Sequence, residues 1–233
     1  MPSVLSSFRA HHLLVLSVLV LASASSNGQF APPPRGTQVH DPAALKPPAG
    51  ARVAIIEFED MECPDCARAN PLLLEASTKY HIPWVRHDFP LPMHPWSFQA
   101  AVNARWFDTK SKAIGDQYRD AVFASQPSIT STDVLAQFTQ KFAQSHSLAL
   151  PFALDPQGTL AGLVKADYAL GQRVGIEHTP TIWVSTANSK GAPFVEVVDR
   201  TRLFQLIDQA LADTASAPRP TAPKPAAKSA SAP

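Results

Sequence analysis

The chain has 233 residues, enough for one or two ordinary domains. Its 45% hydrophobic and 17% charged residues are ordinary for a globular protein. Twenty Lys and Arg against nineteen Asp and Glu leave a formal net charge of +1, so the overall charge gives no argument for a nucleic acid or an anionic membrane as partner.

The beginning of the chain has the features of an export signal. A weakly basic start carries Arg9, residues 13–22 form an apolar run, and residues 22–24 (ASA) are small enough for a signal peptidase. A helix rises only ~1.5 Å per residue, so this run is too short for a bilayer core of ~30 Å. We therefore predict a signal peptide over residues 1–24 and a mature protein exported to the periplasm or a similar compartment. An uncleaved N-terminal anchor is the less favoured alternative.

Segments rich in proline and alanine flank the rest of the chain. Residues 25–50 have no apolar period, and we expect a linker or an arm lying on the domain. Residues 214–233 contain three basic and no acidic residues, and we expect a disordered tail. The folded domain should therefore span residues 51–213.

The domain opens with alternating strand and helix patterns. Residues 52–58 are apolar and β-branched, which is typical of a buried strand. A helix should follow from the cysteine motif to Tyr80, with a kink at Pro71. Residues 82–88 predict a second strand, and because a helix connects the two strands they should be parallel.

Helical patterns fill the middle of the domain, over residues 96–107, 113–124, 132–145 and 160–174. Two more strands are predicted over residues 181–185 and 194–198, joined through the turn sequence Asn188-Ser189-Lys190-Gly191. An amphipathic helix over residues 203–211 completes the domain. The pattern predicts an α/β fold with a mixed sheet, helices on both faces and a helical insertion between the βαβ and ββα halves.

The only two cysteines lie in the motif Cys63-Pro64-Asp65-Cys66 at the start of a predicted helix. A disulfide that closes so short a loop adds little stability, which points to a chemical role. The unpaired N–H groups at a helix N-terminus favour a thiolate at Cys63, and Cys66 would resolve a mixed disulfide. The same spacing occurs in half of a zinc site. Since the chain has no further cysteine, we predict redox chemistry without a metal or cofactor.

Glu57 is the lone acid in an apolar strand, six residues before Cys63. A buried carboxylate at this position could accept the Cys66 proton through a water. The alternative is an acid with its own structural partner.

Pro180 stands at the start of the third predicted strand. A cis bond there would expose the Thr179 backbone for strand-like pairing with a bound peptide. We expect a substrate to contact Thr179 and Pro180, together with Pro64 and Asp65 between the cysteines.

These features resemble the DsbA-like branch of the thioredoxin superfamily. The matching residues are Glu57, residues 63–66, Pro71, residues 87–101 and residues 178–181. The resemblance implies a thioredoxin-like fold with Cys63 as nucleophile and Cys66 as resolving thiol. It also implies that Glu57 is the buried proton acceptor and that Pro180 is a cis-proline facing the disulfide.

The resemblance implies an enzyme, a monomer, that exchanges disulfides with exported proteins and is reset by a membrane-bound or soluble redox partner. A reductase or isomerase-type role is an alternative, although isomerases of this family usually have a dimerisation module and residues 25–50 are too short to supply one. A binding or chaperone domain with an inert disulfide is the non-enzymatic alternative.

One position departs from the resemblance. Strongly oxidising DsbA proteins usually carry His between the cysteines, where this chain has Asp65, and Glu59, Asp60 and Glu62 lie in the same loop. Negative charge near Cys63 disfavours its thiolate. Because a less stable thiolate makes a less oxidising disulfide, we expect a weaker oxidant than a typical DsbA.

Overall fold

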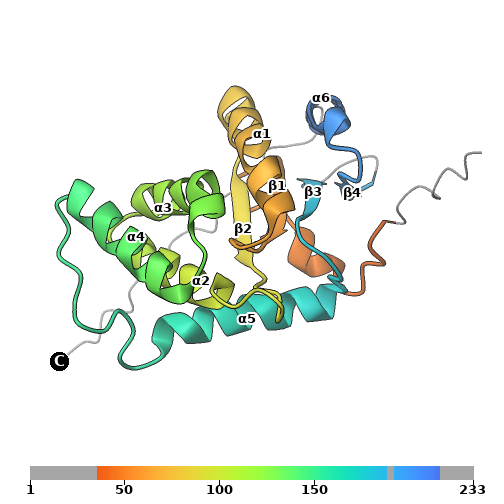
Figure 1. Ribbon diagram of the computed structural model, residues 1–233. Helices are drawn as coiled ribbons and strands as arrows, with labels where there is room; N and C mark the ends of the chain where they lie inside the picture. The colour runs from red at the N-terminus through yellow and green to blue at the C-terminus, as the bar shows by residue number, and fades with distance from the viewer. Residues whose placement is uncertain (1–35, 188–191, 216–233) are drawn as a thin grey trace, which may run out of the picture. The chain divides into compact units, whose positions relative to one another are not determined.

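The computed structural model describes residues 36–187 and 192–215, which form a mixed sheet with helices on both faces (Figure 1). The strand order is β2-β1-β3-β4. The central strand β1 (Val53–Glu59) pairs in parallel with β2 (Trp84–Asp88) and antiparallel with β3 (Thr181–Thr186). The outer strand β4 (Phe194–Glu196) is antiparallel to β3. The predicted mixed sheet is therefore confirmed.

Two strands are shorter than predicted. β2 begins at Trp84 because Pro83 has no N–H to donate, although its carbonyl still accepts a bond of 2.9 Å from the Ile55 N–H. β4 ends at Glu196, where the chain turns towards the short 3-10 helix η3 (Arg200–Arg202). The predicted turn at residues 188–191 lies outside the described residues.

Helices α1 (Pro64–Tyr80) and α6 (Leu203–Thr214) cover one face of the sheet. Their apolar side chains pack on alternate residues of β1 and β3 in a cluster that includes Val53, Ile55, Leu73, Leu203 and Ile207. α1 begins at the cysteine motif and continues through Pro71. The cysteine pair is therefore anchored to the central strand through the helix it begins.

Helix α5 (Thr159–Val174) covers the other face, where Phe58 and Phe89 are buried. Gly171 makes this close packing possible, since a Cβ there would lie 2.5 Å from the Phe89 ring. Residues 36–50 pack beside this layer: they include η1 (Pro42–Leu45), whose Leu45 is only 1% exposed.

The predicted helical insertion is present and lies between β2 and β3. It comprises α2 (Ser97–Asp108), α3 (Lys112–Ser125), α4 (Thr132–Ser145) and α5. Ser111 and Ser131 cap α3 and α4 by accepting bonds from backbone N–H groups. The aromatic core of the insertion also encloses both cysteines.

Hydrogen bonds also join the insertion to residues 61–63, the loop that leads into the cysteine motif. The Gln126 side-chain amide, in η2 (Gln126–Ser128), donates to the Met61 carbonyl at 2.9 Å and to the Cys63 carbonyl at 3.1 Å. Both amide hydrogens are used, so the loop is held on the insertion by one side chain.

Among residues 36–187 and 192–215, no helix has both the length and the apolar character needed to cross a membrane. The predicted signal peptide at residues 1–24 lies outside the described residues, as does the predicted tail beyond residue 215. Helix α6 reaches Thr214, one residue beyond the predicted domain boundary.

Candidate active site

The two cysteines occupy different environments at the start of α1. Cys63 is the N-cap residue and Pro64 the first helical residue, where its missing N–H removes no helical bond. Both thiols are free; Cys63 is 7% exposed and Cys66 is fully buried. Cys63 is thus the more accessible of the two cysteines, and Cys66 lies one turn further along the helix.

The pKa values of the two thiols move in opposite directions. A hydrogen bond from the Cys66 thiol outweighs the effect of burial and, helped by the Thr179 side chain and the backbone N–H groups of Cys66 and Asp65, lowers the pKa of Cys63 to about 5. Burial, together with that same hydrogen bond, raises the pKa of Cys66 well above its ordinary value. At neutral pH Cys63 is a thiolate and Cys66 a thiol.

The segment before β3 brings a backbone carbonyl to Cys63. The Cys63 sulfur lies 3.2 Å from the Thr179 carbonyl oxygen, and the Thr179–Pro180 peptide bond is cis. Two segments 116 residues apart thus meet at the reactive sulfur.

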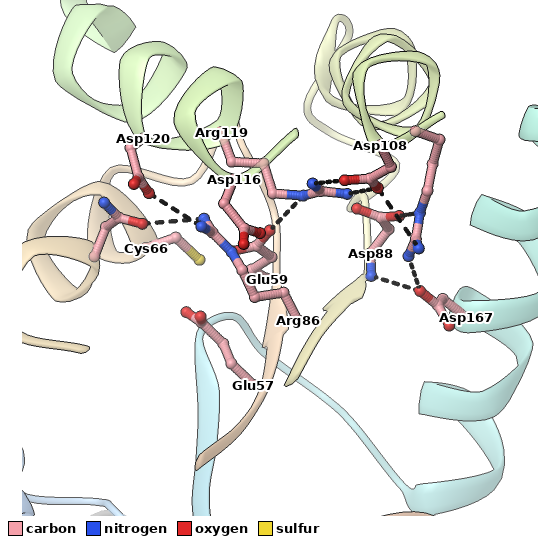
Figure 2. A network of polar contacts seen from close by, with 12 residues as sticks. Glu57, Glu59, Cys66, Arg86, Asp88, Asp108, Asp116, Arg119, Asp120 and Asp167 are labelled. Carbon is pink, nitrogen blue, oxygen red and sulfur yellow. Dashed lines mark hydrogen bonds and ion pairs between the residues drawn. The ribbon is translucent and has the colours of Figure 1, made fainter. Parts of the chain in front are cut away.

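Glu57 lies in β1 and is 1% exposed. Its carboxylate accepts a bond of 2.9 Å from the Trp84 indole N–H, and Figure 2 shows it facing Cys66. Burial, followed by the nearby charge of Glu59, raises the pKa of Glu57 to about 8. Glu57 therefore carries a proton at neutral pH and can exchange it close to that pH.

A buried guanidinium lies next to Glu57 in the network of Figure 2. Arg86 in β2 donates to Glu59 at 2.9 Å, to Asp120 at 3.0 Å and to Asn70 at 3.0 Å. The side chains of Arg86 and Glu59 are only 4% and 1% exposed. This ion pair joins the strands to helices α1 and α3.

The network continues through the insertion. Arg119 donates to both carboxylate oxygens of Asp108, at 2.9 and 2.8 Å. Arg105 bonds Asp88 at 2.5 Å and also contacts Asp167 in α5. Alternating charges therefore extend from beneath the cysteine pair to the far helices of the insertion.

The acids in the loop before Cys63 are also partnered. Asp60 accepts bonds of 2.7 Å from the backbone N–H groups of Glu62 and Leu91, and His94 Nδ1 lies 2.7 Å from its second oxygen. Glu62 accepts from the N–H groups of Trp96 and Ser97 at 2.7 and 3.0 Å, at the start of α2. Positive helix ends and backbone donors therefore surround these carboxylates.

Asp65 has two arginine partners. Arg200 donates to its carboxylate at 2.6 Å and to its backbone carbonyl at 3.1 Å, and Arg68 donates to the carboxylate at 3.0 Å. Partial burial opposes ionisation of Asp65, but these hydrogen bonds and charges outweigh it and lower the pKa of Asp65. The sequence argument considered only the negative charge of these acids and did not include the partners that the fold supplies.

The residues expected to contact substrate lie close to the sulfur of Cys63. Pro64 is exposed at the start of α1, whereas Thr179 and Pro180 are buried beside it. Asp65 and Pro180 line one cavity of about 190 Å³ with His178, Glu196 and Arg200.

Sequence reasoning missed Arg200, Arg86 and Gln126. Arg200 lies 135 residues from Asp65, and no local pattern marks it as a neighbour of the cysteines. Arg86 could have been noticed, because a charged residue inside a predicted buried strand indicates a buried partner of opposite charge.

No cluster of three or more His, Cys, Asp or Glu side chains able to hold a metal ion occurs in the described ranges 36–187 and 192–215.

We compared the chain with known protein families and with curated sequences. The model of a family described as Thioredoxin matches residues 49–200. Comparison with curated protein sequences found no match.

Several solved structures are similar. BdbD from Bacillus subtilis, in its oxidised form, is 20% identical with a TM-score of 0.58, over 76% of this chain and 98% of that one. The thiol-disulfide exchange protein alpha-DsbA2 from Wolbachia pipientis is 15% identical with a TM-score of 0.56, over 70% and 84% of the two chains. The catalytic domain of ScsC from Proteus mirabilis is 16% identical with a TM-score of 0.55, over 74% and 95%. These likenesses confirm the predicted DsbA-like fold.

Proposed function

Because the chain belongs to the thioredoxin family, we propose that it is a thiol–disulfide oxidoreductase acting on protein substrates outside the cytoplasm. The observation that carries the proposal is the state of Cys63: an N-cap thiol with a pKa of about 5, beside a cis-proline segment. A thiolate at neutral pH is both the nucleophile and the good leaving group that disulfide exchange requires.

In the oxidised enzyme a substrate thiolate attacks the Cys63 sulfur, and the Cys63–Cys66 bond breaks. The electron pair goes to Cys66, which needs a proton because burial raises the pKa of its thiol. Protonated Glu57 supplies that proton, directly or through a water.

The second step releases the substrate. Its second thiolate attacks the substrate sulfur of the mixed disulfide, and Cys63 leaves as a thiolate. The substrate has lost two electrons and the cysteine pair has gained them, so a partner that accepts two electrons must reset the enzyme.

The low pKa of Cys63 favours disulfide donation over reduction, because it stabilises the reduced form of the enzyme. This argues against the weak oxidant expected from Asp65 and its acidic neighbours.

The location outside the cytoplasm rests on the apolar run at residues 13–22 and the small residues that follow it. Disulfide donation also suits an oxidising compartment. We further propose that the enzyme works as a monomer without metal or cofactor.

Trapping tests the exchange step. Cys66→Ala protein is incubated with a disulfide-bonded peptide, and covalent adducts are identified by mass spectrometry without reductant. We expect a peptide adduct on Cys63 that dithiothreitol releases, and none in Cys63→Ala protein. If the Cys66→Ala variant forms no adduct, the pair is inert and the proposed activity is wrong.

A further inference from the structure

Arg200 connects the end of the sheet to the residue between the cysteines. It is the first residue of η3, just beyond β4, and its guanidinium bonds Asp65 twice, at 3.1 Å to the backbone carbonyl and at 2.6 Å to the carboxylate. The two bonds come from different nitrogens, so they fix both the position of the Asp65 backbone and the rotamer of its side chain.

The position of Asp65 matters for Cys63. The backbone N–H groups of Asp65 and Cys66 stabilise the Cys63 thiolate, and they belong to the turn that Arg200 holds. An unpaired Asp65 carboxylate in this first turn would repel the thiolate. One arginine thus both orients the stabilising donors and compensates the opposing charge.

A second arginine cannot replace it. Arg68 also bonds the Asp65 carboxylate, at 3.0 Å, but its side chain is 67% exposed, against 33% for Arg200. Solvent screens the exposed pair, and Arg68 makes no bond to the Asp65 backbone.

Arg200 also borders the cavity that contains Pro180 and His178. The side chain therefore lies between the segment after β4, the cis-proline segment and the first turn of α1. Its loss would free the inter-cysteine residues from the C-terminal half of the domain.

We propose that Arg200 is a positioning residue that makes the Cys63–Cys66 pair more oxidising by holding and neutralising Asp65. This inference rests on the proposed function, since it requires a redox-active pair. Arg200 touches neither sulfur and acts only through Asp65.

The test compares variants of the full chain equilibrated with glutathione buffers, together with the pH titration of Cys63 followed by thiolate absorbance. We expect Arg200→Gln to shift the equilibrium constant about 3- to 10-fold towards the disulfide form of the enzyme, or about 15–30 mV towards a less oxidising potential. The Cys63 titration should move to higher pH.

The pair with Asp65 predicts a rescue. Arg200→Gln combined with Asp65→Asn should recover part of the shift, because it removes the uncompensated carboxylate but does not restore the bond to the Asp65 backbone. Arg200→Lys should fall between wild type and Arg200→Gln, because an ammonium supplies the charge but not the two-bonded fork.

Arg202→Gln is the matched control, since Arg202 is two residues away and bonds Gln205 rather than Asp65. We expect it to leave both readouts unchanged. Equal effects of Arg200→Gln and Arg202→Gln, or no rescue by Asp65→Asn, would overturn the inference.

Loss of the proposed function gives a different result. A wild-type protein that shows no glutathione equilibrium refutes the redox activity itself. A redox-active wild type whose potential is insensitive to Arg200 refutes only the positioning role. Urea unfolding of each variant shows whether the fold is retained, and the Lys variant preserves the test if the Gln variant does not fold.

Discussion

Two groups of carboxylates lie near the cysteine pair, and their surroundings differ. Asp60, Glu62 and Asp65 lie in the loop or first turn and are met by backbone N–H groups, a histidine or arginines. Glu57 and Glu59 lie in the central strand, where burial raises the pKa of each. In the first group the arginine partners of Asp65 outweigh burial and lower its pKa, although burial raises the pKa of Glu62. Burial raises the pKa of Glu57 to about 8, so Glu57 keeps its proton at neutral pH.

This difference shows that the effect of acids on a nearby thiolate cannot be judged from their number alone. A carboxylate at the start of a helix with its own donors adds little repulsion, whereas a buried one can store the proton that Cys66 needs in the proposed exchange. The predictions below test whether the two groups are as distinct as this comparison claims.

The largest expected effect concerns the buried group. Arg86→Met removes the cation that bonds Glu59 and leaves a 1% exposed carboxylate without its main partner. We expect a loss of about 3–5 kcal/mol in the free energy of unfolding, measured by urea titration. The control Lys112→Met removes a side chain that is 72% exposed from its pair with Asp116 and should cost under ~1 kcal/mol. Similar losses for both variants would show that the buried network has no special role.

Glu57→Gln should change the pH dependence of stability. The unfolded chain loses this proton near its ordinary pKa of 4.5 and the folded chain near 8. Between these values the folded state holds the extra proton, so Glu57 makes the free energy of unfolding fall as pH rises, by at most ~1.4 kcal/mol per pH unit. Relative to wild type, Glu57→Gln should therefore become more stable from pH 5 to pH 8. A constant difference across this range would mean that Glu57 is ionised in the folded protein.

Cys63→Ser should act with the opposite sign in the reduced protein. Folding lowers the pKa of Cys63 from 9.0 to about 5, so its contribution to stability is complete above pH 9 and is lost as the pH falls towards 5. Relative to reduced wild type, Cys63→Ser should lose stability as pH rises from 5 to 8. The oxidised wild type, in which Cys63 cannot titrate, is the control, and a reduced wild type with the same pH profile would contradict the low pKa.

The smallest effect is expected for Arg68→Gln. Arg68 is largely exposed and pairs with Asp65 across one helical turn, so its loss should cost ~0.5 kcal/mol or less and leave the glutathione equilibrium nearly unchanged. A shift as large as that expected for Arg200→Gln would show that charge alone, rather than the position of Asp65, governs the pair.

Local chemistry made much of the fold predictable. The β-branched run of β1, the helical patterns of α3 and α4 and the cysteine motif each act over a few residues, so their elements appear within one residue of the predicted bounds. Glu57 was identifiable because an acid inside an apolar strand is costly to bury.

The electrostatics of the site could not be predicted in the same way. Whether Asp65 repels Cys63 depends on Arg200, which the fold brings there from 135 residues away. Two of the groups that bond Asp60, the Leu91 N–H and the His94 ring, likewise come from the segment after β2. The sequence shows which residues are charged, but the tertiary fold determines which of them form pairs.

The contact between Cys63 and the Thr179 carbonyl has a consequence for the order of events during synthesis. Its two halves are 116 residues apart, and they meet only when β3 has docked on β1. A growing chain thus presents both cysteines long before the segment that completes their surroundings exists. During synthesis both thiols therefore exist before their site is complete. The pair reaches its mature reactivity only when the C-terminal half of the domain has been made.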